Sequence, residues 1–225
     1  MFNIILLLAS ALVCFGLLVL VERLFKKEGM FVWIGVASVL ANILVCKTIN
    51  LGGFVSSLGN VMFASNFLAA DILTEKYGAK ESRKAVTLGL VAVIGFIITM
   101  QFGLIFMPDA TDIAHESMKT LFSISIRVSI ASVVMYYISN LLNIYIFEKL
   151  GKKIPGKLWF KSGVSTIIAN CSDNYLFAFG AFLFVFDIPT IISIATLGTI
   201  IEFAIGLLQT PFIYLTKDKA QSREL

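Results

Sequence analysis

Two carboxylates stand deep inside long apolar stretches of the sequence. Glu202 lies near the middle of residues 188–214, and Asp173 lies well inside residues 164–186. If these stretches cross a bilayer, a carboxylate at the centre costs at least ~2.5 kcal/mol on insertion scales, so such a residue faces a protein interior or a ligand. The alternative is a structural carboxyl group that is hydrogen-bonded to a neighbouring helix. We favour a functional site for both residues.

Polar and aromatic residues recur at helical spacing around the second carboxylate. Thr166, Asn170, Asp173 and Phe177 share one face of a helix drawn through residues 164–186. A carboxylate accepts hydrogen bonds from ring N–H and amine groups, an amide satisfies a carbonyl, and a phenyl ring stacks. This stripe predicts a site for a flat heteroaromatic ligand. The alternative is a cluster of hydrogen bonds between helices.

Other apolar segments carry similar polar stripes. Asn140 and Asn143 repeat the spacing of Asn170 and Asp173, a pattern that is also compatible with a weak internal repeat. Asn42 is central in residues 30–50. We therefore expect a substrate site assembled from several segments, with these candidates: Asp173, Asn170, Glu202, Asn140, Asn42 and Phe177.

A second pair of carboxylates ends the apolar segment 54–75. Asp71 and Glu75 lie four residues apart on one helix face, and Gly78 marks the expected helix end. Negative charges at a helix C-terminus oppose the macrodipole and repel each other. We expect this pair to meet cations, with Lys161 as a candidate, in an ion network. Three roles are equally compatible with the carboxylate pair: a gate, a contact with the ligand, and a plain ion pair.

Two more cations lie near the other ends of their segments. Lys47 and Arg127 have long side chains that extend to a membrane surface, and a gating or anion-attracting role is an equal alternative. The candidates for gating or an ion network are therefore Asp71, Glu75, Lys47, Arg127 and Lys161.

The composition indicates which elements position these residues. Hydrophobic residues make up 58% of the 225, mean hydropathy is +0.92, and only 14% of residues are charged, which is typical of an integral membrane protein. A helix needs roughly 20 residues to cross a bilayer. We predict an all-α bundle of about seven transmembrane helices forming one domain over residues 1–225, or six if one segment is re-entrant. The predicted spans are 2–21, 30–50, 54–75, 85–107, 124–147, 164–186 and 188–214.

The basic residues predict an orientation in the membrane. Most of the 18 Lys and Arg residues fall within 23–27, 76–84, 149–161 and the tail after 216, which share one side if there are seven spans. By the positive-inside rule, this side is cytoplasmic, so we expect the N-terminus outside and the C-terminus inside the cell membrane. No basic residue precedes the first segment, so it is expected to be retained rather than cleaved as a signal peptide. The net charge of +4 then reflects topology, not nucleic-acid binding.

Several classes of chemistry are disfavoured. The three cysteines fall inside predicted spans without metal-ligand spacing, and the single histidine, His115, lies in a predicted outer loop. There is no phosphate-binding loop and no evident nucleophile–base pair. We therefore expect no catalytic residue, metal or cofactor, and favour transport over a membrane enzyme. An assembly scaffold is also disfavoured, because it would not need midplane carboxylates.

Five stretches of the chain resemble the queuosine precursor transporters, once called vitamin-uptake-like proteins. The most specific is "DILTEKYG" at 71–78, and the next is "LWFKSGVSTIIANCSDNYLF" at 158–177. The others are "ANILVCKTI" at 41–49, "SIRVSIASVVMYYISNLLNIYIF" at 125–147 and "TPFIY" at 210–214. The resemblance implies a membrane fold like that of vitamin-transporter S-components.

The resemblance also implies a function and partners. It implies import of small 7-deazaguanines, such as the 7-cyano and 7-aminomethyl compounds or queuine, for tRNA queuosine salvage. The alternative is a substrate-binding subunit that needs a separate energising ATPase module. The family pattern has a Lys near Glu202, and a carboxylate there suits a cationic ligand such as the aminomethyl compound. The expected partners are thus this substrate and the lipid bilayer, with no nucleic acid and the oligomeric state open.

Overall fold

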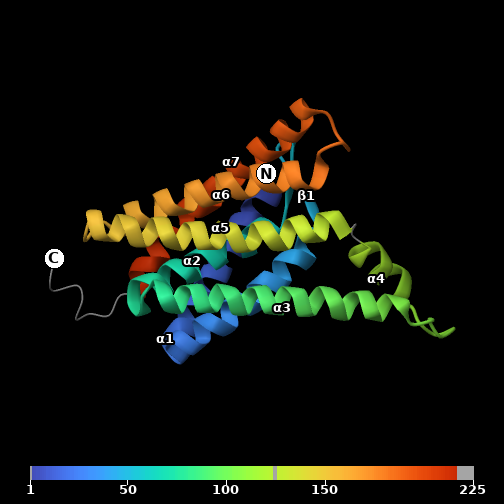
Figure 1. Ribbon diagram of the computed structural model, residues 1–225, viewed down its shortest axis with the longest axis horizontal. Coiled ribbons are helices and arrows are strands. Elements are labelled where there is room, and N and C mark those ends of the chain that lie inside the picture. The colour runs from blue at the N-terminus through green and yellow to red at the C-terminus, as the bar shows by residue number, and fades with distance from the viewer. Residues whose placement is uncertain (1, 124–125, 217–225) are drawn as a thin grey trace.

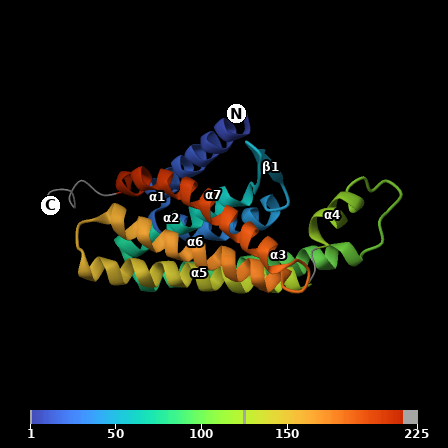
Figure 2. The ribbon, with the colours of Figure 1, turned by 90° about the horizontal axis from the view of Figure 1, so that it is seen from above.

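The chain folds into a bundle of long helices with one short β-hairpin among the residues described. The computed structural model describes residues 2–123 and 126–216, without the side chains of residues 54, 55 and 126–129. Figure 1 shows α3 and α5 running side by side, with α6 and α7 crossing above them, and Figure 2 shows the bundle from above. The elements are α1 (Phe2–Leu44), β1 (Thr48–Leu51), β2 (Phe54–Ser57), α2 (Gly59–Tyr77), α3 (Ala79–Ile105), α4 (His115–Phe122), α5 (Ile126–Lys153), α6 (Leu158–Phe182) and α7 (Ile188–Leu215).

The first helix, α1, consists of two arms joined at a sharp turn. Lys26 has φ 53° and ψ −131°, which no helical residue adopts. A Cβ atom on Gly29 would lie 2.8 Å from the carbonyl oxygen of Val21, so the arms approach each other more closely than a side chain allows. The two arms correspond to the predicted segments 2–21 and 30–50.

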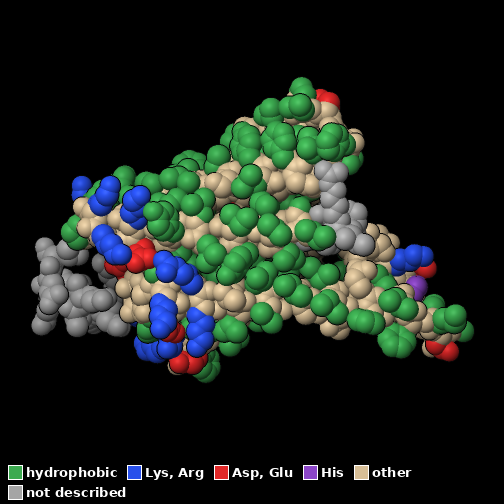
Figure 3. All heavy atoms as spheres, in the orientation of Figure 1, with side chains coloured by type: hydrophobic (Ala, Val, Ile, Leu, Met, Phe, Trp, Pro, Cys, Tyr) green, Lys and Arg blue, Asp and Glu red, His purple; other side chains and the backbone are tan. Residues whose placement is uncertain are grey.

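The bundle has two chemically different ends. The hairpin end comprises β1, β2, α4 and the start of α1, where Asn3 donates to the carbonyl of Asn50 at 3.0 Å. The basic end comprises residues 22–28, 76–84, 148–161 and the end of α7, where Arg23 donates to the carbonyl of Leu215 at 3.0 Å. On the face in Figure 3, Lys and Arg gather mainly at the basic end. The start of α1 and the end of α7 therefore lie at opposite ends of the bundle.

The hairpin replaces helix that the sequence had led us to expect. Residues 48–50 were assigned to one span and 54–57 to the next, but helix α1 ends at Leu44 and α2 begins at Gly59. The strands pair antiparallel with Leu51 opposite Phe54. Gly52 and Gly53 form the two-residue turn with φ of 68° and 102°, which glycine adopts without steric cost. The predicted boundaries of these two spans were wrong for this reason.

The surface between the ends is apolar. Four helical segments among the described residues are long and apolar enough to cross a membrane: Phe2–Leu44, Ala79–Ile105, Ile130–Lys153 and Ile188–Leu215. Hydrophobic side chains cover most of the middle of the molecule in Figure 3. These features confirm an all-α, multi-pass membrane protein. The count of seven crossings stays a prediction, because α2 and α6 are not among those four segments.

Helix α4 lies in the connection between α3 and α5 and begins at His115. Its last turn is tied to the ends of two other helices. Gln101 of α3 donates to the carbonyl of Phe122 at 2.8 Å, and the Cys46 thiol lies 3.5 Å from the carbonyl of Leu121. The ring of Phe122 also packs edge-on against Phe96, with centroids 5.7 Å apart. These contacts hold α4 over the hairpin end of the bundle.

Helix α7 begins at a defined cap. The Asp187 side chain accepts hydrogen bonds from the Thr190 hydroxyl at 2.6 Å and from its backbone N–H at 3.3 Å. These bonds, mainly the one from the hydroxyl, hold the pKa of the Asp187 carboxyl below its usual range. A carboxylate at this position also interacts favourably with the helix dipole. The cap sets where α7 starts and therefore where Glu202 lies along it.

Candidate functional site

A cavity of about 780 Å³ lies at the hairpin end, between the hairpin and the adjoining halves of the long helices. Its volume falls within the range typical of small-molecule sites, roughly 300–1,000 Å³. Most of its wall is apolar, and several aromatic rings contribute to it. Rings of this kind provide flat faces for stacking. They are Phe63, Phe96, Phe122, Tyr136, Phe177 and Phe182.

The polar part of the wall is acidic. Asp173 of α6 and Glu202 of α7 both line the cavity, and none of its lining residues among those described is Lys, Arg or His. Ser139 of α5 donates to Asp173 Oδ1 at 2.7 Å, and the Asn174 amide donates to Glu202 Oε2 at 2.7 Å. One oxygen of each carboxylate is thus held by a neutral donor. Two acidic groups without a cation on the wall favour a ligand that donates hydrogen bonds or carries positive charge.

Four of the six predicted substrate residues line this cavity. Asp173, Glu202 and Phe177 come from α6 and α7, and Asn42 comes from the second arm of α1. Asn42 accepts a hydrogen bond from Ser132 of α5 at 3.3 Å and donates to the carbonyl of Ser38 at 2.9 Å. The fold brings these four residues together from distant parts of the chain. Their role in binding stays a prediction.

The other two, Asn140 and Asn170, do not line the cavity. Asn140 is buried and donates to the carbonyl of Tyr136 at 2.8 Å. Asn170 is buried beside a separate void of about 20 Å³, which Thr166 and Gly206 also line. Residues three positions apart differ by about 60° around a helix, so Asn170 faces helix α7 while Asp173 faces the cavity. Neither amide lines this cavity, and a role for them in substrate binding stays a prediction.

The sequence reading missed Asn174 as a polar residue of the cavity. Its amide donates to Glu202, as above, and also to the carbonyl of Asn170 at 3.0 Å. It packs so closely on Gly198 that a Cβ there would collide with its side-chain oxygen. Gly198 precedes Glu202 by one helical turn, so the small residue leaves space for the partner of the carboxylate. The spacing of Gly198 and Glu202, four residues apart, was the sequence signal that could have indicated a partner for this carboxylate.

The second predicted carboxylate pair lies at the basic end, and its two members have different partners. Asp71 is completely buried and accepts from the Ser162 hydroxyl at 2.5 Å and the Asn143 amide at 2.7 Å. Glu75 instead accepts from Lys161 at 2.6 Å. The expected cation therefore contacts Glu75, whereas Asp71 has neutral partners only among the described residues.

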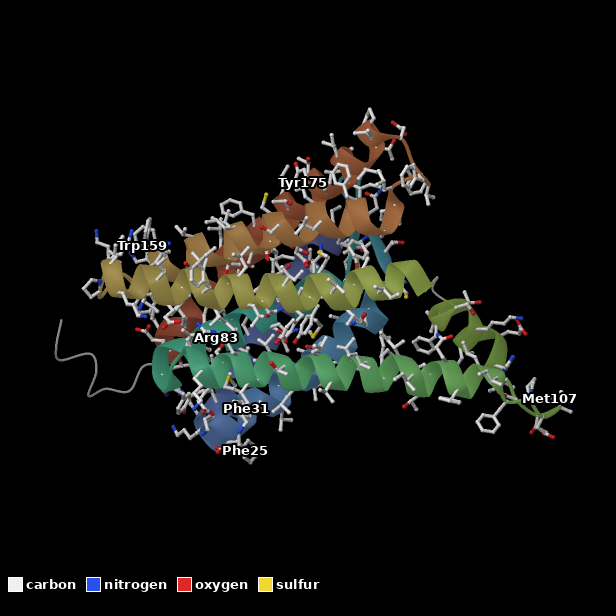
Figure 4. All side chains as sticks on the ribbon, in the orientation of Figure 1. Phe25, Phe31, Arg83, Met107, Trp159 and Tyr175 are labelled. Carbon is white, nitrogen blue, oxygen red and sulfur yellow. The ribbon has the colours of Figure 1, made fainter. Side chains whose placement is uncertain are left out.

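The basic end contains a further buried ion pair and exposed pairs. Lys76 Nζ lies 2.7 Å from Glu22, whose side chain is almost completely buried. At the surface, Arg83 of α3 lies 2.8 Å from Glu148 of α5, and Figure 4 marks Arg83 beside α5. Figure 4 also marks Trp159 at the start of α6, at this same end. Ion pairs thus connect α1 to α2, α2 to α6 and α3 to α5.

Of the two remaining predicted gating cations, only Lys47 has a described side chain. Lys47 is exposed just before β1 and does not line the cavity. The side chain of Arg127 lies outside the described residues. A gating role for these two residues stays a prediction.

Comparison with known proteins gives the family. Residues 57–216 match the family model described as "Putative vitamin uptake transporter". The chain is 35% identical over 209 residues to the "Probable queuosine precursor transporter" of Bacillus subtilis (strain 168), covering 92% of this chain and 91% of the relative. It is 25% identical to the "Queuosine precursor transporter" of Escherichia coli (strain K12), over 63% of this chain and 62% of that protein. No solved structure matches the chain.

The B. subtilis match extends along almost the whole chain, and the family model covers α2 to α7, including Asp71, Glu75, Asp173 and Glu202. The S-component likeness of the fold is untested by these matches and stays a prediction. On the extent of both matches, this chain belongs to the vitamin uptake transporter family, together with relatives named as queuosine precursor transporters.

Proposed function

We propose that this protein imports 7-deazaguanine precursors of queuosine across the cell membrane. Two relatives that match the chain are named as transporters of queuosine precursors. The observation that carries the proposal is the cavity at the hairpin end, which combines aromatic rings with Asp173 and Glu202. Flat aromatic bases with several N–H donors match such a wall by stacking and hydrogen bonding.

Asp173 is the residue that we assign to the purine-like ring. Guanine-type rings present an N1–H and a 2-amino group side by side, and one carboxylate accepts from both. Ser139 already donates to Asp173 Oδ1, which fixes the orientation of the carboxylate. The 6-oxo group of the ring needs a donor. Asn42 and Asn60, which both line the cavity, have amide N–H groups for this purpose.

Glu202 is the residue that we assign to the substituent at position 7. It is held by Asn174 and lies on the same cavity as Asp173. With no described cation on the wall, an aminomethyl group would supply the compensating positive charge. The cyano compound has no such charge and would leave Glu202 unpaired or protonated. We therefore expect the aminomethyl compound to bind more tightly.

The direct test uses purified protein in liposomes that contain no other protein. Radiolabelled 7-aminomethyl-7-deazaguanine should enter these vesicles faster than protein-free controls, and excess unlabelled compound should compete. Uptake by this chain alone would argue against a substrate-binding subunit that needs a separate ATPase module. Binding without any uptake would favour that subunit. Absence of both binding and uptake of 7-deazaguanines would refute the proposed function.

The proposed orientation places the hairpin end outside and the basic end in the cytoplasm. The basic clusters support it through the positive-inside rule. The test is cysteine labelling in a variant lacking Cys14, Cys46 and Cys171, with single cysteines at positions 2 and 220. An impermeant thiol reagent should label position 2 in intact cells and position 220 only after lysis. Equal labelling of both positions would contradict seven crossings.

A further inference from the structure

A second polar cluster lies outside the cavity, around Asp71 at the basic end. The Asp71 side chain comes from α2 and is completely buried. Its two carboxylate oxygens accept from Asn143 of α5 and Ser162 of α6, at 2.7 and 2.5 Å. Gln209 of α7 extends the cluster by donating to Ser162 at 3.4 Å and to Thr166 at 3.0 Å. Four helices thus converge on one buried carboxyl group.

The charges around Asp71 do not balance. On its own helix, Glu75 faces it one turn away, and on α6 the nearest cation, Lys161, is bound to Glu75 at 2.6 Å. Among the described residues, α5 and α7 contribute only the neutral amides of Asn143 and Gln209. The pair formed by Lys76 and Glu22, between α2 and α1, is neutral by itself. An ionised Asp71 is therefore a buried charge in excess, and a bound cation or proton would remove it.

The amides next to Asp71 suit a group that changes its protonation state. Asn143 donates its Nδ2 to the carboxylate, while its own Oδ1 is buried without a hydrogen-bond partner. If the carboxyl group were protonated, rotation of this amide would offer Oδ1 as the acceptor. Gln209 Oε1, in the same cluster, is also buried without a partner. Buried unpaired amide oxygens are rare in folded proteins, so two beside one buried carboxyl group need an explanation.

A stripe of buried polar residues on α5 and α6 lies between this cluster and the cavity. It follows α5 and α6 towards Ser139, which donates to Asp173 on the cavity wall. The two amides that failed to reach the cavity wall belong to this stripe, and both have an unpartnered buried oxygen. The stripe consists of Ser139, Asn140, Asn143, Ser162, Ser165, Thr166 and Asn170, all of them buried.

We propose that Asp71 is a proton-binding site that couples uptake to the proton gradient. This inference rests on the proposed function, because it supplies that import with a driving force. Asp71 takes up one proton from the outer side through the cavity and the polar stripe while substrate is bound. It releases the same proton to the cytoplasm at the basic end, and no other bond is made or broken. Asp71 makes no contact with the substrate in this scheme.

The test measures accumulation in liposomes under an imposed gradient. The probe is 7-cyano-7-deazaguanine, which is neutral and so does not itself respond to membrane potential. With the outside one pH unit more acidic, one proton per substrate supports up to about tenfold accumulation. We expect Asp71→Asn to bind and exchange the compound across the membrane as before but to lose this accumulation. Glu148→Gln removes an exposed carboxylate at the same end and should accumulate like the unmodified protein.

The outcomes separate this inference from the proposed function. If the unmodified protein takes up no 7-deazaguanine, the proposed function fails. If it takes up the compound but equilibrates without accumulation, or accumulates only with a sodium gradient, proton coupling is wrong. Accumulation by Asp71→Asn equal to that of the unmodified protein would also overturn the role of Asp71. If Asp71→Asn does not fold, the unmodified protein is tested alone in weakly buffered medium with a pH-sensitive dye. Proton coupling requires that addition of substrate draws protons into the vesicles, and no change in pH would contradict it.

Discussion

The cavity at the hairpin end and the cluster at the basic end both contain buried carboxyl groups, but in different surroundings. Asp173 and Glu202 each receive one hydrogen bond from the protein and face a space of about 780 Å³. Asp71 has both oxygens occupied by side chains and does not line this space, and Glu75 is paired with Lys161. The first pair keeps oxygen atoms available to a ligand, whereas the oxygens of the second pair are bound by side chains of the protein, although the charge of Asp71 is not balanced.

This contrast follows the positions of the acids in the sequence: the two that lie deep in their apolar segments line the cavity, whereas the two at the end of residues 54–75 do not. All four carboxylates are costly in a membrane, and each is stabilised by specific donors. What differs is whether open space adjoins the carboxylate. We therefore expect substitutions at the hairpin end to act on ligand affinity, and substitutions at the basic end to act on stability or coupling.

The largest effect is expected for Asp173→Ala. Removal of the carboxylate leaves the ring donors of a bound 7-deazaguanine unpaired, so affinity should fall by roughly tenfold to over a hundredfold. Isothermal calorimetry at fixed pH measures this change. Asp112→Ala, in the exposed loop before α4, is the matched control and should bind normally. Unchanged affinity in Asp173→Ala would reject the cavity as the binding site.

The second prediction concerns the buried ion pair at the basic end. Lys161→Met leaves Glu75 without its cation, and loss of one partner of a buried pair is strongly destabilising. Because about a quarter of the Glu75 side chain is exposed, we expect a smaller loss of about 1–3 kcal/mol, seen as a lower melting temperature in detergent. Ligand affinity should stay within about twofold.

The double variant Lys161→Met/Glu75→Met tests whether removal of both charges restores the stability that the single variant loses. The double variant has no unpaired charge from this ion pair and should regain most of the lost stability. If it is less stable than Lys161→Met alone, the contact between Lys161 and Glu75 is not what stabilises the basic end. If either variant loses ligand binding by more than tenfold, the functional separation of the two ends is wrong.

The third prediction divides the ligands by charge. Glu202→Gln keeps the shape of the side chain but removes its charge, so the aminomethyl compound should bind about tenfold more weakly. The cyano compound should change by no more than about twofold. Both affinities are measured on the same preparation of protein. An equal loss for the two compounds would show that Glu202 does not recognise the substituent at position 7.

The smallest effect is expected for Gly198→Ala. The added methyl group collides with the Asn174 side chain and should displace it from Glu202. We expect a loss in affinity for the aminomethyl compound of about two- to fivefold, as for one weakened hydrogen bond. Gly95→Ala is the control, since nothing lies within 4 Å of a Cβ atom there. A loss of the same size in Gly95→Ala would mean that the effect is general rather than local.

Much of the helical architecture was predictable from the sequence because the apolar segments are long. Gly78 was expected to end a helix, and α2 does end at Tyr77, with Gly78 at φ 88°. The hairpin was missed because its strands are only four residues each and continue the apolar character of their neighbours. The pair Gly52 and Gly53 between them was the turn signal that hydropathy obscured.

The residue types of the site were predictable from the sequence, but the directions in which their side chains point were not. Asp173 and Glu202 stood out because carboxylates are rare in apolar segments, and both do line one cavity. The amides could not be placed, because a rotation of about 60° on a helix decides between a cavity and a helix interface. Asn170 and its near neighbour Asn174 have the same side chain, and only the packing of α6 on α7 distinguishes them. Such packing depends on contacts distant in sequence.

The turn at Lys26 has a consequence for biogenesis. The two arms of α1 come close together at Gly29, immediately after the turn, and Arg23, Lys26 and Lys27 lie at or beside their junction. Charged residues at such a junction resist translocation, so the arms can enter the bilayer together as a helical hairpin while the rest of the chain is still being synthesised. The close packing at Gly29 requires no later helix for its formation. The N-terminal arms would then provide a preassembled surface on which α2 and α7 dock.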